Sequence, residues 1–131
     1  MNNTHKTSTN NVEEFVKDYI NAWSTTDAGA RKALVAKVYA DDVDFYANEP
    51  GDGPVEHHGV AEITANIARV NARLVQGKGL ITESTGFSVN HDALKVSWRM
   101  MTPDRKVAMT GMNLLLRNAS GKISRDYIFI G

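Results

Sequence analysis

Apolar residues in the first half of the chain recur at the three- and four-residue spacing of amphipathic helices. Three such helices are predicted: residues 12–24, then from an N-cap at Asp27 through Tyr39, then from Val60 to Val75, where the sequence QGKG ends the pattern. The third has the clearest stripe. Each helix therefore has an apolar face that must pack against something else.

The second half changes to the β-branched and aromatic content of strands, after one earlier strand at residues 43–48. The segment 49–59 has two prolines and three glycines, which predict a loop. Four strands joined by short turns then follow, at residues 80–89, 93–102, 106–117 and 122–130. The order α-α-β-α-β-β-β-β indicates an α+β fold, in which a curved antiparallel sheet packs its apolar face on three helices.

Length and composition limit the function classes. The 131 residues fit one domain, residues 12–131, behind a polar leader, residues 1–11, that we expect to be disordered. Fifteen acidic residues balance fifteen basic ones, so we expect no nucleic-acid partner and no membrane partner. There is no cysteine and no apolar stretch of membrane-spanning length, which favours a cytoplasmic location.

The last strand carries a carboxylate where apolar residues are expected. Period-two alternation puts Asp126 in one row with Ser124, Ile128 and Ile130, on the face that meets the helices. An unpaired buried carboxylate costs several kcal/mol, so Asp126 has hydrogen bonds, stays protonated or borders a cavity. One interpretation is a general acid/base with a raised pKa; the other, slightly favoured by the pattern alone, is a structural Asp.

Two further polar residues share the predicted apolar cup. Tyr19 on the first helix could present its hydroxyl as a donor, and Asn113 on the third strand of the meander could add a second. Two donors aimed at one oxygen stabilise an enolate. The alternatives are an ordinary core tyrosine and a cross-strand amide bond.

The walls of the cup follow from the same alternation. Val96, Trp98 and Met100 share the concave side of their strand. His57, His58 and His91 lack the spacing of a metal site, and no metal is expected, although His58 could reach the cup from its loop. The expected ligand-binding residues are Phe15, Trp23, Phe45, His58, Trp98, Met100 and Met109.

The order of elements, with the segments DYINAWSTTD, YADDVDFY, HHGVAEITANI and GKISRDYIFIG, resembles the nuclear transport factor 2-like superfamily. Within it, SnoaL-like polyketide cyclases and ketosteroid isomerases are the most similar groups. The resemblance covers nearly all of the chain after the leader. It implies a cone of curved sheet with an apolar pocket, no cofactor, and a homodimer through the outer sheet face, where Ile123, Tyr127 and Phe129 are expected.

The resemblance also implies roles for single residues. Tyr19 matches the oxyanion-hole tyrosine of ketosteroid isomerases, and Asn113 stands where they have a protonated Asp. Ala47 stands at the position of their general base, and alanine cannot abstract a proton. Asp126 is a replacement base, similar to the acid/base Asp of SnoaL-like cyclases. The last strand also resembles that of limonene epoxide hydrolases, but Lys95 and Ser97 interrupt the Asp-Arg-Asp set of those enzymes.

These patterns together predict a pocket for a small apolar carbonyl compound. Asp126 would move a proton next to the carbonyl, as in isomerisation or cyclisation, while Tyr19 and Asn113 hold the oxyanion. The alternative is a non-catalytic binding module for a small hydrophobic ligand, and epoxide hydrolysis is a distant third.

Overall fold

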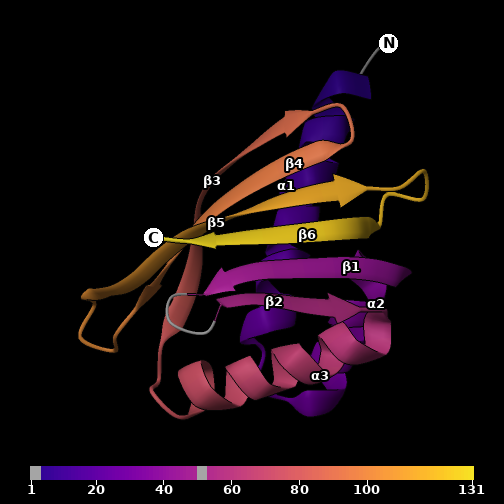
Figure 1. Cartoon of the computed structure of the whole chain (residues 1–131). Helices are drawn as coiled ribbons and strands as arrows, with labels where there is room; N and C mark the ends of the chain where they lie inside the picture. The colour runs from indigo at the N-terminus through magenta and orange to yellow at the C-terminus, as the bar shows by residue number, and fades with distance from the viewer. Residues whose placement is uncertain (1–3, 50–52) are drawn as a thin grey trace.

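The structure is a computed structural model that describes residues 4–49 and 53–131, with side chains over 11–48 and 55–131 (Figure 1). The helices are α1 (Thr4–Ser24), α2 (Ala28–Val38) and α3 (Val60–Val70), and α3 continues into the π-helix η1 (Asn71–Gln76). The strands are β1 (Tyr39–Glu49), β2 (Gly53–His58), β3 (Ile81–Asn90), β4 (Ala93–Met101), β5 (Val107–Arg117) and β6 (Ile123–Ile130).

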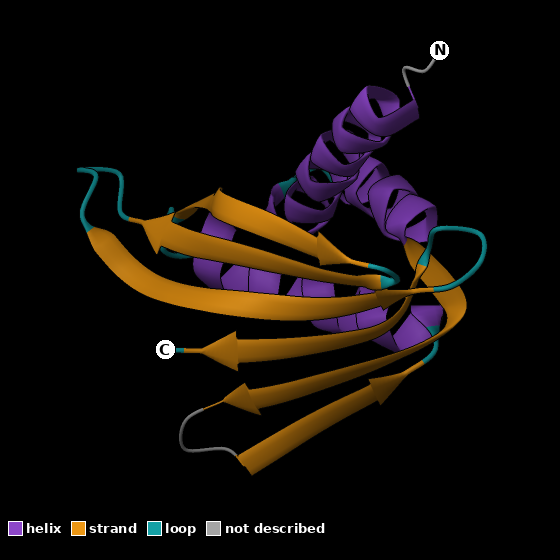
Figure 2. Cartoon of the chain, turned by 90° about the horizontal axis from the view of Figure 1, so that it is seen from above, coloured by secondary structure: helices purple, strands orange, loops and turns teal. Residues whose placement is uncertain are grey.

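The strands form one curved six-stranded sheet in the order β2-β1-β6-β5-β4-β3. Neighbouring strands are antiparallel except β1 and β6, which run parallel. Seen from above, α1 and α2 lie on one side of the curved sheet (Figure 2), and α3 contacts β1 and β2. The predicted α+β fold, with its helices and its curved sheet, is therefore confirmed.

The first two helices show the local chemistry that the sequence predicts. Asp27 is the N-cap of α2, and its Oδ2 accepts a hydrogen bond from the backbone N–H of Ala30 at 2.8 Å. The helix α1 begins at Thr4, so part of the segment expected to be a disordered leader is helical. Residues 1–3 of that segment lie outside the described residues.

The predicted loop 49–59 is the main error in the element order. Residues 53–58 form β2, which pairs antiparallel with β1 from Glu49↔Gly53 to Asp44↔His58. The prolines of this segment predict a loop, but β2 is an edge strand, and an edge strand accepts a proline whose nitrogen faces away from the sheet. The histidines of this segment therefore belong to a strand.

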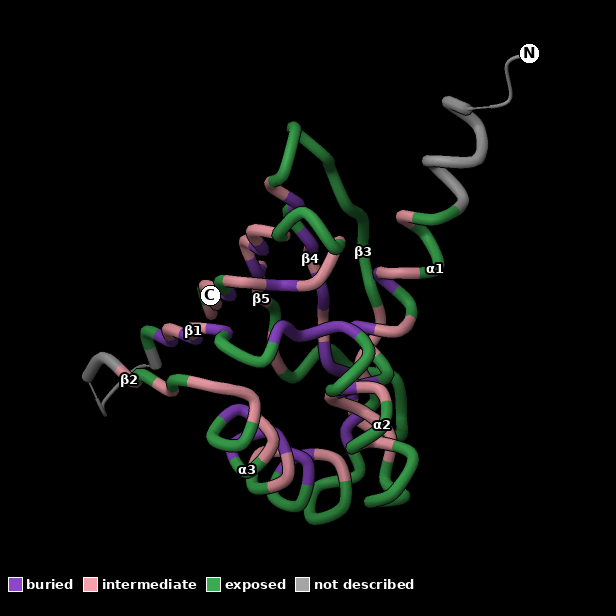
Figure 3. The backbone as a smooth tube through the Cα atoms, turned by 90° about the vertical axis from the view of Figure 1, so that its right-hand side faces the viewer, coloured by how far each residue is buried: buried purple, intermediate pink, exposed green. Residues whose placement is uncertain are grey.

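Buried residues occur in both the helices and the strands (Figure 3), and their side chains form two clusters. The larger one packs the inner faces of α1, α2 and α3 on the sheet, with Val35, Val38, Ile63 and Ile67 fully buried. The smaller one contains Leu74, Leu80, Trp98 and Met100. Three of these residues, Leu74, Trp98 and Met100, line the cavity described below.

The prediction that Ile123 lies on the outer face of the sheet is wrong. Ile123 is fully buried in the larger cluster and cannot contribute to an outer interface. The pairing of β5 with β6 shifts register between Leu116↔Arg125 and Arg117↔Ile123, so β6 has one residue more than β5 at this point. Because a bulge breaks the period-two alternation, Ile123 and Asp126 both point inward although they are three residues apart.

Candidate functional site

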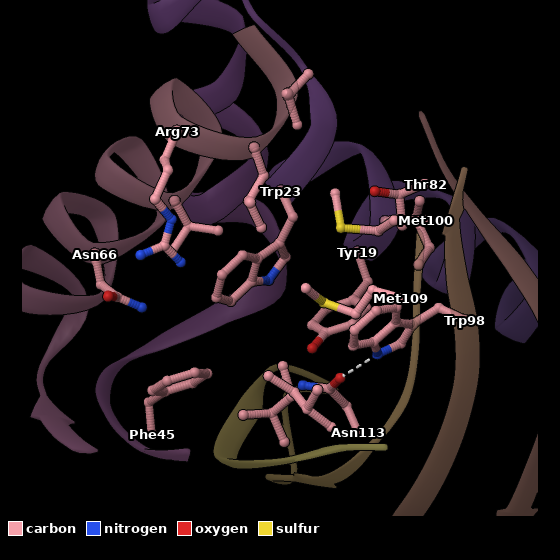
Figure 4. Close-up of a pocket in the computed structure, with 16 residues that line it drawn as sticks. Tyr19, Trp23, Phe45, Asn66, Arg73, Thr82, Trp98, Met100, Met109 and Asn113 are labelled. Carbon is pink, nitrogen blue, oxygen red and sulfur yellow. Dashed lines mark hydrogen bonds between the residues drawn. The ribbon is translucent and has the colours of Figure 1, made fainter. Parts of the chain in front are cut away.

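A cavity of about 430 Å³ lies between the helices and the concave side of the sheet (Figure 4). Such a volume suits a small organic molecule. Its wall is mainly apolar and aromatic, with a few polar side chains. The lining residues from the helices include Tyr19, Ile20, Trp23, Asn66, Arg73 and Leu74, and those from the sheet include Phe45, Thr82, Trp98, Met100, Met109, Asn113 and Ile128.

Asp126 lies behind this wall as the acceptor of three hydrogen bonds. Its Oδ2 accepts from the hydroxyls of Tyr19 at 2.9 Å and Tyr39 at 2.6 Å, and its Oδ1 accepts from Asn113 Nδ2 at 2.7 Å. The three donors come from α1, the start of β1 and β5, elements that the fold brings together around β6. Asp126 therefore has partners on both carboxylate oxygens.

The charge of Asp126 has no cation beside it among the described residues. Burial raises the pKa of Asp126 from 3.8 to about 6, while the hydrogen bonds from Tyr39, Asn113 and Tyr19 act in the opposite direction. Burial and the nearby carboxylate raise the pKa values of Tyr19 and Tyr39, so both remain hydroxyl donors. A carboxyl group with a pKa near neutrality can gain and lose a proton at working pH.

The two tryptophans of the chain extend this network. Trp98 Nε1 donates to Asn113 Oδ1 at 2.7 Å, which fixes the amide with its nitrogen toward Asp126, and Trp23 Nε1 donates to the Tyr39 hydroxyl at 3.0 Å. Trp98 lies directly over Gly111, where an added Cβ would be 2.3 Å from an indole carbon. Gly111 is thus required for the position of Trp98.

The cavity touches only part of the network. Tyr19 and Asn113 line it, whereas Asp126 and Tyr39 do not. The structure brings Tyr19, Asn113 and Asp126 together through two hydrogen bonds. Asp126, however, can act on a bound molecule only through the Tyr19 hydroxyl or the Asn113 amide.

Most of the predicted wall residues line the cavity, namely Trp23, Phe45, Trp98, Met100 and Met109. Phe15 does not line it, since it packs against the Arg117 guanidinium, 5.0 Å from its ring centroid. His58 does not line it either. It lies on edge strand β2 with an exposed side chain, and its Nδ1 is 2.7 Å from Asp44 Oδ1.

The sequence pattern does not reveal three residues of the site. Tyr39 was assigned to the end of the second helix, although it opens β1. Asn66 and Arg73 line the cavity beside the apolar stripe of the third helix. Asn66 and Val70 are four residues apart, and Val70 and Arg73 are three apart, so all three lie on one side of a helix. This spacing is the signal in the sequence that Asn66 and Arg73 share a face with an apolar residue.

Neither a metal site nor a membrane span is present in the part of the chain that the structure describes. No three His, Asp or Glu side chains there gather as metal ligands. None of its helices is long and apolar enough to cross a membrane.

Solved structures with the same fold include three with related descriptions. A candidate isomerase of the SnoaL-like family from Agrobacterium tumefaciens has a TM-score of 0.76 and 23% identity, covering 90% of this chain and 95% of that one. A candidate polyketide cyclase from Sinorhizobium meliloti has a TM-score of 0.61 and 20% identity over 88% and 94% of the two chains. A ketosteroid isomerase-like protein from Catenulispora acidiphila, solved with trimethylamine, has a TM-score of 0.67 and 17% identity over 88% and 84%.

No family model matches the chain, and no curated protein matches it. The structural likeness establishes that the chain has the nuclear transport factor 2-like fold of SnoaL-like and ketosteroid isomerase-like proteins. A shared fold does not fix an activity, which must be argued from the site.

Proposed function

We propose that the protein binds a small, largely apolar carbonyl compound and catalyses proton transfer next to the carbonyl, as in an isomerisation or a cyclisation. One observation supports this most strongly. Asp126 is fully buried, its pKa is raised to about 6, and one of its three donors, Tyr19, also lines the cavity. That combination provides a base of suitable strength one hydroxyl away from a ligand.

The proton would move through Tyr19. Because Tyr19 donates its only hydrogen to Asp126, it cannot also donate to a ligand oxygen, which changes its expected role. A proton leaves the substrate carbon for Tyr19 Oη while the Tyr19 hydrogen passes to Asp126 Oδ2. The electron pair of the broken C–H bond forms an enolate. In an isomerisation, reversal of the relay returns the proton to another carbon. In a cyclisation, the enolate carbon instead attacks a second carbonyl carbon of the substrate, and the relay returns the proton to the alkoxide oxygen that forms.

Asn113 is suited to hold the enolate oxygen. Its Nδ2 carries two hydrogens, of which one is bonded to Asp126, and the residue lines the cavity. The hydrogen bond from Trp98 fixes the orientation of the Asn113 amide, so its second Nδ2 hydrogen is held in position before a ligand binds. Asp126, Tyr19 and Asn113 thus have distinct roles as proton acceptor, relay and oxyanion donor.

The test measures exchange of ketone α-protons for deuterium by NMR, since this step is common to isomerases and cyclases. A medium-chain methyl ketone is the probe. Asp126→Asn should lower the exchange rate at least about 100-fold with little change in ketone affinity, because it removes the base and keeps the shape. Tyr19→Phe should do the same. Equal exchange in the wild type and both variants would disprove the relay.

A second function is a non-catalytic binding module for a small hydrophobic ligand. The observation that favours it is that Asp126 has hydrogen bonds on both oxygens without any ligand and does not line the cavity. In that case the network only shapes the pocket. The wild type would then bind the ketone and catalyse no exchange above the solvent rate.

We also propose that the protein forms a homodimer through its outer sheet face. Phe129 is 50% exposed there, and the strand register places Met112, Leu114 and Tyr127 on the same face. Burying such a patch against a second copy would remove apolar surface from water. Sedimentation of the wild type and Phe129→Lys should show a dimer that the charge weakens; a monomeric wild type would rule it out.

A further inference from the structure

The cavity has a second polar region, formed by Asn66 of α3 and Arg73 of η1. Both side chains line the cavity, and they extend from the helical wall, whereas Trp98 and Asn113 belong to the sheet (Figure 4). The catalytic proposal uses neither residue. Asn66 and Arg73 are therefore available to bind a part of the ligand other than the carbonyl.

Asn66 presents a hydrogen-bond donor to the cavity. The residue is only 5% exposed, and its Oδ1 accepts a hydrogen bond from Arg69 Nη2. Arginine has donors only, so this contact fixes the amide orientation and turns Nδ2 away from Arg69. No acceptor among the described residues binds that Nδ2 group. Because Asn66 lines the cavity, this donor is available to a molecule bound there.

Arg73 adds a positive charge to the same region. No carboxylate among the side chains over 11–48 and 55–131 lies within ion-pair distance of its guanidinium, in contrast to Arg99, which pairs with Glu83. The residues that line the cavity include no Asp and no Glu. Arg73 is an exposed residue that lines the cavity, so its charge is hydrated, and a ligand group that accepts from it would have no competing carboxylate in the cavity wall.

The π-helix holds Arg73 at this wall. The backbone N–H of Gly77 donates to Ala72 O at 2.9 Å, a five-residue step, and a Cβ on Gly77 would be 2.6 Å from the Arg73 carbonyl oxygen. The fully buried Asn71 ties the start of η1 to the end of α1 by donating to Trp23 O at 2.7 Å and Thr25 O at 3.1 Å. Such π-helical turns are frequent at functional sites.

We infer that the natural ligand carries a carboxylate that Arg73 and Asn66 bind, at the end away from the carbonyl that Asn113 binds. The substrate class is therefore an oxo acid with an apolar middle. A guanidinium and an amide donor match the two oxygens of a carboxylate. The inference rests on the proposed function for the position of the carbonyl, but recognition of the acid group depends on Arg73 and Asn66 alone.

The experiment compares a medium-chain methyl ketone that ends in a carboxylic acid with its methyl ester. Both tryptophans of the chain line the cavity, so their fluorescence reports binding directly. The wild type should bind the acid about tenfold more tightly than the ester, the effect of one charge-assisted contact. Arg73→Gln should remove that preference. Lys78→Gln is the matched control, because it removes the same charge from a residue that does not line the cavity.

The outcomes separate this inference from the catalytic proposal. Equal affinity of the wild type for acid and ester overturns the inference, whether or not the ketone undergoes proton exchange. The same holds if Lys78→Gln abolishes the preference as fully as Arg73→Gln does. An Arg73-dependent preference in a protein that exchanges no proton supports the inference and leaves the pocket as a binding site for an oxo acid.

Discussion

The two polar regions at the cavity differ in whether their hydrogen-bond donors have acceptors within the protein. Around Asp126, the hydroxyls of Tyr19 and Tyr39 and one Asn113 hydrogen all have an acceptor, and the acceptor is fully buried. Around Arg73 and Asn66, donors face the cavity and find no acceptor among the described residues. The first region is part of what holds the fold together, and the second is suited to a molecule from outside.

This comparison is tested most severely by Asp126→Leu. The change leaves three buried donors without an acceptor, at about 1 to 3 kcal/mol each, partly offset by the loss of a buried charge. We expect the free energy of unfolding to fall by roughly 3 to 5 kcal/mol in urea denaturation. Asp126→Asn is the control, because its amide can donate to the tyrosine oxygens and accept from Asn113. Equal stability of the two variants would contradict a structural role for the network.

A second expectation concerns pH. The pKa of Asp126 is about 6 in the folded protein and near 3.8 when unfolded, so the folded state binds the proton more tightly. The resulting stability is complete below about pH 4 and is lost as pH rises through 6, in total roughly 3 kcal/mol. Asp126→Asn should lack this loss. Unfolding free energies of both proteins across pH 4 to 8 provide the measurement, and parallel profiles would refute the raised pKa.

A smaller effect is expected from Gly111→Ala. The added Cβ would be 2.3 Å from a Trp98 ring carbon, so the indole must move and its hydrogen bond to Asn113 is strained. Overpacking of this kind costs about 1 to 3 kcal/mol. The tryptophan emission should shift, and ketone affinity should fall. Gly29→Ala is the control, since its Cβ would make only an ordinary 3.6 Å contact. A similar loss of ketone affinity in Gly29→Ala would show that the effect of Gly111→Ala does not depend on Trp98.

Much of the fold was predictable because its signals are local. The stripe on α3, the Asp27 cap and the turns between β3 and β6 follow from residue spacing within a few positions. Alternation along β4 and β5 also placed Trp98 and Asn113 on the concave side, where both line the cavity. The Asp126, Asn113 and Tyr19 cluster was found because a polar residue in an apolar row is conspicuous.

The remaining features depend on contacts between distant segments. Two features leave no local signature in the sequence: the parallel pairing of β1 with β6, and the bulge in β6 opposite β5 that buries Ile123. Tyr39 is visible as a donor to Asp126 only when β1 lies beside β6. His58 was expected at the cavity because a loop can bend inward, and an edge strand holds it outside.

The finest test separates the two tyrosines that donate to the same oxygen. Tyr39→Phe and Tyr19→Phe each remove one bond to the ionised form of Asp126, so each should raise its pKa by about one unit, seen in an NMR titration of its carboxyl carbon. Only Tyr19 lines the cavity, so only Tyr19→Phe should also abolish proton exchange of the bound ketone. If Tyr39→Phe abolishes exchange equally, the proton does not pass through Tyr19 alone, and both hydroxyls must take part in the relay.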